Sequence, residues 1–379
     1  MKKILFVVNV DWFFVSHRLP IALEAQKRGY EVHLACSFTC KKEYLERLGI
    51  VCHKLDVSRS GSSLKGELST VRAVRRVLTG IVPDVVHAVT IKPVIYTGCV
   101  LQSMRNPPAF VAAISGLGYV FTANTFRAKL TKLLVSLMYK VALLGKRKMV
   151  IFQNTSDQRI LSEIVNLHQR DKTLIKGSGA DLSVYKYQSE PLTKKKVVSM
   201  ACRLLKEKGV YQFVDAARVV KKKLPDTEFW LIGSIDPENP NSVSQKEVDD
   251  WAREGLINAL GHRDDIPKLF SLSHIVTMPS FYGEGVPKVL IEAAACGRPI
   301  VTTDNPGCRD AVIDSTTGLL VPIKDSNALA IALFSLLSDD DRRIKMGQQA
   351  RQFAVKEFDV NNVVLRHLEI YDSLMVDKL

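Results

Sequence analysis

Two glutamates, Glu284 and Glu292, stand eight positions apart in the stretch GEGVPKVLIEAAACG, which runs from residue 283 to residue 297. Between them lies GVPKVLI, a pattern typical of the opening of a buried helix. Carboxylates placed in this way could serve four kinds of chemistry. They could form an acid/base pair, bind a metal, cap a helix or clamp the two ends of a ligand.

The predicted helix favours the ligand clamp. Pro287 suits the first helical position, where its missing N–H costs nothing, and Gly297 ends the helix. The N-terminus of such a helix attracts anions, and Glu292 would lie about 8 Å further along at about 1.5 Å per residue. That separation is long for a shared proton and suits an elongated ligand with a phosphate between the carboxylates. A capping role fits Glu284 only, and an exposed surface position fits Glu292 poorly because VLIEAAA is otherwise apolar.

A pair of cations follows the apolar run KVVSMAC. Arg203 and Lys208 lie in the turn that leads from this predicted strand into the next helix. The planar fork of arginine and the point charge of lysine together suit a diphosphate. Alone they could be ordinary surface residues, but with the helix end they indicate a nucleotide diphosphate that carries a further group.

The elements that must position these residues alternate along the chain. Short apolar runs separated by helical patterns are typical of buried parallel strands, and the alternation pauses at residues 176–196, which are rich in Gly, Ser, Pro and Lys. We therefore predict an α/β protein with two facing Rossmann-like domains and a cleft between them, at residues 1–178 and 179–359. The helix at about 360–379 is expected to pack back on the first domain. Ligands should bind where the parallel strands end.

The charge of the 379-residue chain is strongly basic, with a formal net charge of +14. Residues 85–156 contain no Asp or Glu, and seven basic side chains fall within residues 126–148, interleaved with Leu, Val and Met. This pattern predicts a basic amphipathic helix on an anionic membrane surface, with a core-facing helix and a solvated basic back as the alternative. A nucleic-acid partner is not expected, because aromatic stacking residues and recognition motifs are missing from the pattern.

The remaining composition favours a cytoplasmic protein that is peripheral on the inner face of the cytoplasmic membrane. The seven cysteines are scattered, which fits reduced thiols. The apolar run at the start is short and ends at Asn9 and Asp11, so a signal peptide is not expected. No apolar run reaches the length of about 18 residues that spans a membrane. The DDD at 339–341 is interpreted as a helix cap and not as a metal site.

Three stretches carry a family resemblance: ACRLLKEKG, the segment from LGHRDD to TTGLLVP, and FDVNNVVLRHLEIYDSL. They resemble the retaining family 4 glycosyltransferases of GT-B fold (glycosyl transferases group 1), among them bacterial transferases that build surface polysaccharides on lipid-linked acceptors. The resemblance covers nearly the whole chain and is strongest over about 197–325. The glutamate pair together with the Arg/Lys pair is a specific combination.

The resemblance implies a donor site. Arg203 and Lys208 would bind the donor diphosphate and stabilise the leaving group, Glu284 would bind the donor sugar, and Glu292 would hold the ribose. Further donor-binding positions would be Gly285, Val286, Pro287 and Lys288 beside the diphosphate and sugar, and Gly261, His262 and Arg263 at the base. Helix-end amides would take the place of a metal, so no divalent ion or other cofactor is expected.

The first domain resembles the acceptor half of the family less closely, since the glycine pair that many relatives carry after the first strand is missing. His17 and Arg18, at the helix opened by SHRLP, are candidates for an acceptor phosphate, with a core role as the alternative for His17. His87 is predicted at a strand end facing the cleft, as a hydrogen-bond donor beside the reacting sugar. The loop with Ser115, Gly116 and Gly118 resembles one that faces polyprenyl diphosphate, or is a generic turn.

The expected activity is retaining transfer of an N-acetylhexosamine or hexose from a UDP-sugar to an undecaprenyl-diphosphate-linked sugar. Such a reaction would serve the assembly of a bacterial O-antigen, capsule or glycoprotein glycan. Two alternatives stay open: a UDP-GlcNAc 2-epimerase of the same fold, which needs no acceptor, and a transferase with a soluble acceptor.

Overall fold

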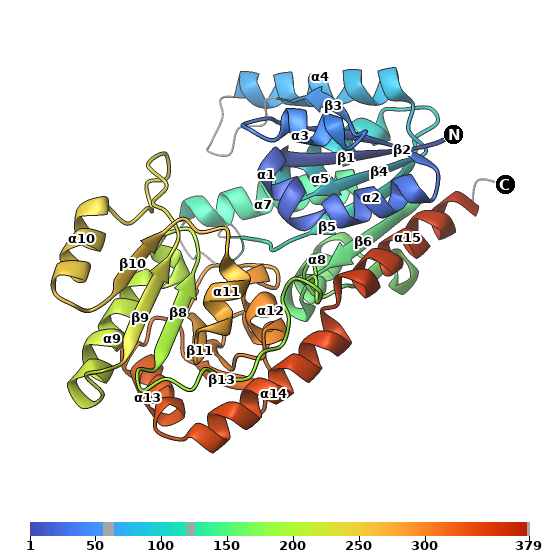
Figure 1. Ribbon diagram of the computed structural model, residues 1–379. Coiled ribbons are helices and arrows are strands. Elements are labelled where there is room, and N and C mark those ends of the chain that lie inside the picture. The colour runs from blue at the N-terminus through green and yellow to red at the C-terminus, as the bar shows by residue number, and fades with distance from the viewer. Residues whose placement is uncertain (56–63, 119–120, 122–125, 377–379) are drawn as a thin grey trace. The chain divides into compact units, whose positions relative to one another are not determined.

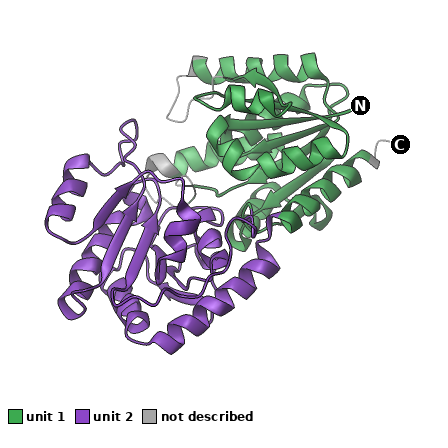
Figure 2. Ribbon diagram, viewed as in Figure 1, with its two compact units in different colours: residues 1–178, 361–379 green, residues 179–360 purple. Residues whose placement is uncertain are grey.

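The computed structural model spans residues 1–379 and describes all of them except 56–63, 119–120, 122–125 and 377–379 (Figure 1). Two compact units divide the chain (Figure 2). Unit 1 holds residues 1–178 and 361–379, and unit 2 holds residues 179–360. The last helix therefore returns to the unit that contains the N-terminus.

Unit 1 is built on a parallel sheet of seven described strands in the order β3-β2-β1-β4-β5-β6-β7. The central strands β4 and β5 are buried throughout, which explains their unbroken apolar sequences. The strands are β1 (Lys2–Val10), β2 (Tyr30–Ser37), β3 (Val51–Lys54), β4 (Val85–Val89), β5 (Ala109–Ile114), β6 (Lys148–Phe152) and β7 (Lys172–Leu174).

Helices cover both faces of this sheet. On one face, side chains of α4, α5 and α7 form a core cluster with Leu5 and Val86. The neighbouring residues Phe6 and His87 point to the other face, where Phe6 contacts α1 and His87 contacts α15. The helices are α1 (Asp11–His17), α2 (Leu19–Lys27), α3 (Lys42–Arg47), α4 (Leu64–Ile81), α5 (Ile91–Gln102), α7 (Phe126–Ala142), α8 (Thr155–Val165) and α15 (Val360–Val376).

The chain turns into a helix directly after β1, earlier than the sequence suggested. The helix α1 begins at Asp11, and a break at Arg18 separates it from α2. The Asp11 carboxylate is buried and accepts hydrogen bonds from the backbone N–H groups of Thr39, Cys40 and Lys41. Asp11 thus ties this turn to the loop after β2, a long-range contact that local sequence does not reveal.

The sequence predicted His87 at a strand end, and this prediction is wrong. It is the third of the five residues of β4, and its side chain is fully buried. Its Nδ1 is joined by a hydrogen bond of 2.6 Å to the hydroxyl of Tyr371 on α15, and its ring stacks near that of His367. In this structure His87 is a core residue that helps to dock α15 on the sheet.

Acid should weaken this packing. Burial lowers the pKa of His367 to about 3, and its Nδ1 bonds to the carbonyl of Val363. A histidine whose pKa is lower in the folded state stabilises the fold above its unfolded pKa of about 6.5 and loses that contribution as the pH falls. Between pH 7 and 5 the chain should therefore lose about 2 kcal/mol through His367. Thermal melts should show a smaller acid effect in His367→Phe; an equal effect in both proteins would contradict this.

Unit 2 repeats the architecture with six described parallel strands in the order β10-β9-β8-β11-β12-β13. These are β8 (Val197–Ala201), β9 (Glu228–Ile232), β10 (Asn258–Gly261), β11 (Ile275–Met278), β12 (Ile300–Thr303) and β13 (Gly318–Val321). The helices are α9 (Val210–Lys223), α10 (Gln245–Arg253), α11 (Ile266–Ser271), α12 (Lys288–Ala295), α13 (Ser326–Leu337) and α14 (Asp340–Glu357). The side chain of Asp339 caps α14, which confirms the helix cap predicted in the DDD sequence.

Candidate active site

A pocket of about 450 Å³ lies in unit 2, where β8, β9 and β10 end. This is the edge at which parallel sheets bind ligands. The pocket brings together four of the predicted donor-binding residues and others that were not predicted. Its lining consists of Ala201, Cys202, Arg203, Ile232, Gly233, Ser234, Ile235, Asp236, Pro237, His262, Arg263, Ile266, Val289 and Glu292.

Gly233 explains how the loops after β8 and β9 come close enough to form this pocket. Its φ is +137°, and a Cβ there would lie 1.8 Å from the backbone oxygen of Cys202. Only glycine combines that backbone angle with such an approach. The residue could be recognised from the sequence EFWLIG, in which a glycine directly follows a buried strand.

Arg203 lies at the rim of the pocket in an ion pair. Its Nη1 lies 3.2 Å from an oxygen of Asp236, which follows β9, and its side chain is about half exposed. The carboxylate holds the guanidinium over the ends of two strands, a position suited to an anionic ligand. Sequence reasoning missed Asp236, because a single acidic residue in a loop carries no distinctive signal.

Lys208 and Glu284 form a second ion pair next to the pocket. The Nζ of Lys208 lies 2.5 Å from one oxygen of Glu284, and the hydroxyl of Ser280 lies 2.5 Å from the other. Burial disfavours the charged form of Lys208, but the Glu284 carboxylate outweighs that effect, and the pKa of Lys208 is raised. Gly209 permits this meeting, because a Cβ there would lie 2.3 Å from the oxygen of Pro279.

The loop that carries Glu284 is held in place by side chains that donate hydrogen bonds to its backbone carbonyls. The side-chain amide of Asn305 donates to the carbonyl of Tyr282 at 2.5 Å, and the hydroxyl of Thr303 donates to the carbonyl of Ser280. These bonds come from the end of β12 and fix the loop after β11. The carboxylate of Glu284 is therefore presented from a rigid support, as a catalytic or binding group requires.

The helix α12 begins one residue later than predicted. Pro287 precedes the helix in an extended conformation, with φ −63° and ψ 124°, and Lys288 is the first helical residue. The first N–H groups of a helix lack acceptors within it, so this end can still receive an anion. The residues Gly285 and Val286 lead into it, and Gly297, with φ +74°, follows its end.

Glu292 is buried and lines the pocket, in agreement with its apolar sequence context. Burial raises the pKa of its carboxyl, while Lys288 and Tyr185 act in the opposite direction. The Nζ of Lys288 lies 3.7 Å from the carboxylate. Tyr185 was not predicted, since it comes from a segment distant along the chain and without a motif.

The loop after β10 carries the three residues expected at the base. Gly261 ends β10 with φ +64°, and His262 and Arg263 follow it into the pocket lining. The guanidinium of Arg263 forms two hydrogen bonds of 2.7 Å with Asp265, which precedes α11. This pair fixes the loop whose residues His262 and Arg263 line the pocket.

The predicted acceptor residues all belong to unit 1, and His87 is buried in β4 as described above. Arg18 is also buried, and its Nη2 lies 3.5 Å from the hydroxyl of Ser115, directly after β5. The ring of His17 stacks on Phe13 at 4.2 Å. Gly116 and Gly118 follow Ser115 with φ values of +109° and +66°. The predicted loop continues through residues 119 and 120, which lie outside the described part of the chain.

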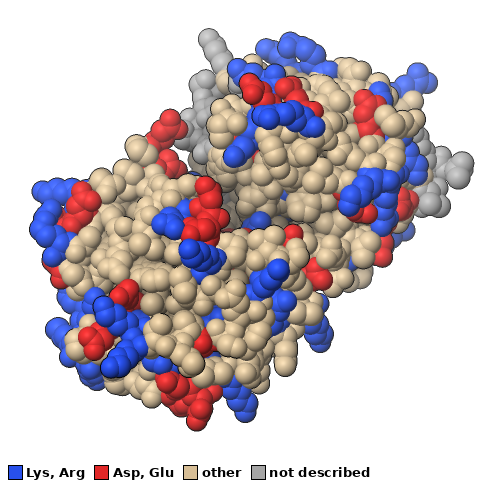
Figure 3. All heavy atoms as spheres, viewed as in Figure 1, with Lys and Arg blue, Asp and Glu red and all other residues tan. Residues whose placement is uncertain are grey.

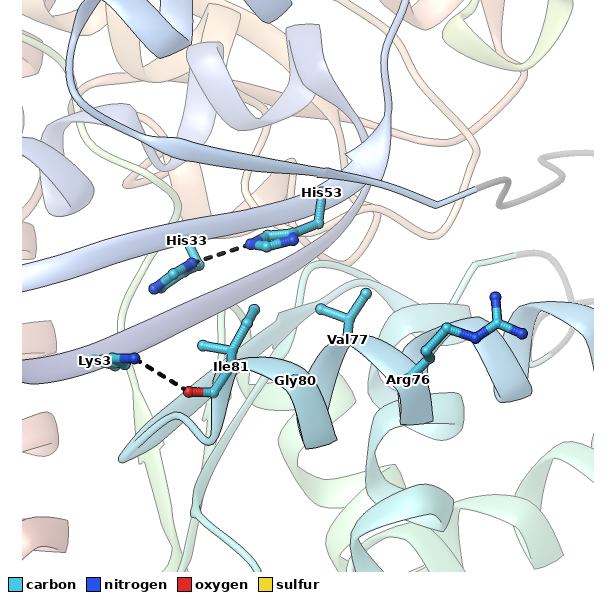
Figure 4. Close-up of a pocket in the computed structure, with 7 residues that line it drawn as sticks. All are labelled: Lys3, His33, His53, Arg76, Val77, Gly80 and Ile81. Atoms are coloured by element: carbon cyan, nitrogen blue, oxygen red, sulfur yellow. Dashed lines mark hydrogen bonds between the residues drawn. The ribbon is translucent and has the colours of Figure 1, made fainter.

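A second hollow, of about 410 Å³, lies in unit 1 between the start of β1 and the end of α4 (Figure 4). His33 and His53 are joined across it by a bond of 3.0 Å, and Lys3 reaches the carbonyl of Ile81. Lys3 is the second residue of β1, so this end of the strand is opposite to the ligand-binding edge of a parallel sheet. We do not assign the hollow to the active site.

The helix α7 exposes an apolar stripe. One side of the helix, with Tyr139 and Ala142, is buried, and Gly98 permits close packing because a Cβ there would lie 2.5 Å from the oxygen of Ala142. The other side presents large aliphatic residues to solvent, between 38% and 68% exposed. They are Leu130, Leu133, Leu134, Leu137, Val141 and, just after the helix, Leu144.

Six of the seven basic residues of segment 126–148 have side chains that the structure describes, and these six are divided between two roles. Lys129, Lys132, Lys140 and Lys146 are exposed beside the stripe. By contrast, Arg147 donates to the carbonyl of Leu374 and Lys148 pairs with Asp171 at 3.1 Å, so both serve packing within unit 1. On the face drawn in Figure 3, basic side chains are scattered over both units among acidic ones.

The described residues contain no helix with the length and apolar character needed to cross a membrane. Nor do three or more His, Cys, Asp or Glu residues come together there in a way that could hold a metal ion. Independence from a divalent metal stays a prediction.

Two family models match this chain and show the class of enzyme to which it belongs. Residues 183–353 match the family of glycosyl transferases group 1, and residues 3–154 match the family described as glycosyl transferase 4-like. The chain belongs to this family of glycosyltransferases and has the two Rossmann-like units of its GT-B fold. The predicted family and fold class are thereby confirmed.

Among the relatives, one extends over nearly the whole chain and another over about half of it. The N,N'-diacetylbacillosaminyl-diphospho-undecaprenol alpha-1,3-N-acetylgalactosaminyltransferase of Campylobacter jejuni is 27% identical over 96% of this chain and 98% of the relative. The UDP-Gal:alpha-D-GlcNAc-diphosphoundecaprenol alpha-1,3-galactosyltransferase of Escherichia coli is 27% identical over 48% of this chain and 46% of the relative. The crystal structure of Anabaena Alr3699/HepE with UDP and glucose shares the fold, with a TM-score of 0.77, 20% identity, and coverage of 98% and 100% of the two chains.

Proposed function

We propose that the protein transfers an N-acetylhexosamine or hexose, with retention, from a UDP-sugar to a sugar linked to undecaprenyl diphosphate. The observation that carries the donor half is the pocket with Arg203 and Glu292, beside the Lys208–Glu284 pair. The acceptor class is supported by the names of the Campylobacter and Escherichia coli relatives, both of which act on diphospho-undecaprenol sugars. Assembly of a bacterial surface glycan follows from such an acceptor.

Retention is supported by the same names. Both relatives form alpha linkages, and sugars in UDP-Gal and similar donors are alpha-linked to the diphosphate. The acceptor hydroxyl would then attack from the face that the diphosphate leaves. Arg203 and Lys208 would neutralise the growing negative charge on that leaving group, and Glu284 would hold the sugar hydroxyls. Catalysis would rest on positioning and on electrostatic stabilisation.

Binding at the inner face of the cytoplasmic membrane would bring the enzyme to such an acceptor. The apolar stripe of α7, flanked by four exposed lysines, supports this part of the proposal. An exposed apolar stripe with a basic border suits the boundary between acyl chains and anionic headgroups. Leucines as well as lysines of α7 face outward, so the proposed membrane contact would be apolar as well as electrostatic.

The activity is tested by incubating the enzyme with UDP-GalNAc, UDP-GlcNAc, UDP-Gal and UDP-Glc, each with and without polyprenyl-diphospho-GlcNAc. We expect UDP release that depends on the acceptor and a product with an alpha linkage. Conversion of UDP-GlcNAc without any acceptor would favour the epimerase. Transfer to a soluble sugar at equal efficiency would remove the lipid from the proposal.

Glu292 should mainly control nucleotide affinity. Glu292→Gln removes one charge-assisted hydrogen bond to the ribose, so the Kd of UDP should rise about tenfold, while kcat at saturating donor should change little. Because burial raises the pKa of this carboxyl, UDP affinity of the wild type should also fall as the pH drops and the carboxyl takes up a proton. Calorimetric titration of UDP measures both effects, with the exposed Glu369→Gln as the control. Unchanged affinity in Glu292→Gln would contradict the assignment.

A further inference from the structure

The hollow of about 410 Å³ in unit 1 has no role in the proposed transfer, yet its volume is typical of a small-molecule site (Figure 4). Four of its seven lining residues are basic or titratable, and none of the seven carries a carboxylate. The four are Lys3, His33, His53 and Arg76. A cavity with this lining should attract an anion.

The hollow lies between the sheet of unit 1 and the last turns of α4. Lys3, His33 and His53 belong to the neighbouring strands β1, β2 and β3. In the view of Figure 4, Lys3 lies at one end of the hollow and Arg76 at the other, with the two imidazole rings on the strand side. Gly80 keeps the helix side open, because a Cβ there would meet no packing neighbour within 4 Å.

The positive charges at the two ends are weakly engaged. No Asp or Glu of the described residues forms an ion pair with Arg76, whose side chain is exposed. The Nζ of Lys3 lies 3.5 Å from the carbonyl of Ile81 and 4.0 Å from the carboxylate of Glu31, at the outer limit of such contacts. The planar fork of arginine and the ammonium of lysine both suit a phosphate group.

The two histidines can add a further charge. The Nε2 of His33 lies 3.1 Å from the carboxylate of Glu31, which favours a proton on that nitrogen. The Nδ1 of His33 then accepts the bond of 3.0 Å from the Nε2 of His53. His53 can therefore take up a proton at its Nδ1 without breaking either contact, whereas a second proton on His33 would break the bond between the rings.

The surroundings keep this pair neutral until an anion binds. Burial lowers the pKa of His33 and of His53, and although Glu31 raises that of His33, the pKa stays below its usual value. The charged groups around the pair come from several elements. They are Lys3 on β1, Glu31 on β2, Arg76 on α4 and, bonded to the backbone of Lys3, Asp84. A bound anion would favour the protonated form of His53.

We propose that the hollow binds a small organic phosphate, with its phosphate group among Arg76, Lys3 and the histidine pair and its body along Gly80 and the neighbouring apolar side chains of α4. A free phosphate ion would fill only a small part of about 410 Å³, which favours a ligand with a larger body. This site does not depend on the proposed transfer. The donor pocket belongs to unit 2, and the hollow lies at the edge of its own sheet opposite to the usual ligand-binding edge.

Calorimetric titration of the full chain, saturated with UDP to occupy the donor pocket, tests the site. We expect glucose 1-phosphate or glycerol 3-phosphate to bind once per chain and at least tenfold more tightly than inorganic phosphate. Arg76→Met should weaken this binding about tenfold or more, because it removes a charge-assisted hydrogen bond. The matched control is Arg75→Met, also exposed on α4 but outside the lining, which should bind like the wild type.

The proposal is overturned if neither phosphate ester binds, if inorganic phosphate binds equally tightly, or if Arg76→Met binds as tightly as Arg75→Met. Gly80→Leu gives an independent check on the location. Leucine is a better helix former than glycine, so this variant should melt no lower than the wild type, while its side chain takes up space in the hollow and weakens binding. Undiminished binding in Gly80→Leu would place the ester elsewhere.

Sulfate tests the part played by His53, because the charge of sulfate is constant between about pH 7.5 and about pH 6. Its Kd should fall severalfold over this range in the wild type, since the bound anion favours proton uptake. In His53→Gln the amide can still donate to His33 but takes up no proton, so the Kd should stay constant. Equal pH dependence in both proteins would overturn the assignment of the titrating group to His53.

Discussion

Lys208→Ala should lower kcat by about 100- to 1,000-fold, the usual effect of removing one group that stabilises charge in a transition state. In the proposed reaction, negative charge grows on the diphosphate as its bond to the sugar breaks. Lys208 is placed to meet that charge by the turn after β8, which Gly209 brings against the loop after β11. The Kd of the donor should rise by a smaller factor, because the ground-state diphosphate carries less charge on the leaving oxygen.

The control for this prediction is Lys206→Ala. Lys206 lies in the same short turn, but its side chain is exposed, so its removal should leave kcat nearly unchanged. Near-normal turnover of Lys208→Ala at saturating donor would contradict the assigned role. Lys208→Arg should restore only part of the rate, because the planar guanidinium does not reproduce a compact ammonium.

The pairing of Lys208 with Glu284 adds a second expectation. Removing the lysine leaves the Glu284 carboxylate, 2.5 Å away, without its cationic neighbour, so part of the loss comes from a displaced glutamate. The double variant Lys208→Met/Glu284→Gln should therefore lose much less activity than the product of the two single losses. Multiplicative losses would show that the two residues act independently.

The positions of the candidate donor residues could be predicted from the sequence because the signals that mark them are local. Arg203 and Lys208 follow the buried strand β8, and Glu284 lies in the loop after β11; the end of a strand can be recognised from its apolar run. Glu292 is the fifth residue of α12 and is recognised as the one charged residue in an apolar helical stretch. The residues that were missed reach the pocket from elsewhere. Asp236 follows another strand, and Tyr185 comes from the start of unit 2, so only tertiary packing brings them together.

The candidate acceptor residues of unit 1 were harder to place, because their burial depends on how far along a strand or helix each residue lies. His87 was expected at a strand end, but β4 continues to Val89, which places the histidine under α15. The burial of Arg18 likewise depends on α1, a helix that begins where the sequence suggested only the end of a strand. In α7 both sides of the helix are apolar, so periodicity could not show which leucines face solvent.

Replacing Leu133 and Leu137 by serine should weaken binding to anionic vesicles by about 100-fold. The two side chains are 68% and 58% exposed and lie one turn apart on the stripe. If each inserts about half of its apolar surface, together they contribute about 3 kcal/mol, which equals about a 100-fold change in partitioning. The fold should be little affected, since exposed substitutions usually change stability by less than about 0.5 kcal/mol.

Vesicle sedimentation at low and high salt measures this effect, and Leu192→Ser, an exposed leucine of unit 2, is the control. Lys132→Gln and Lys140→Gln should each weaken binding by about 1 kcal/mol at low salt and much less at high salt, because only their part is electrostatic. The leucine effect should persist in high salt.

Unchanged vesicle binding, with a dimer converted to a monomer, would instead assign the stripe to a second copy of the chain. The two occupants are distinguishable because a bilayer requires the lysines beside the stripe, whereas an apolar contact between copies does not.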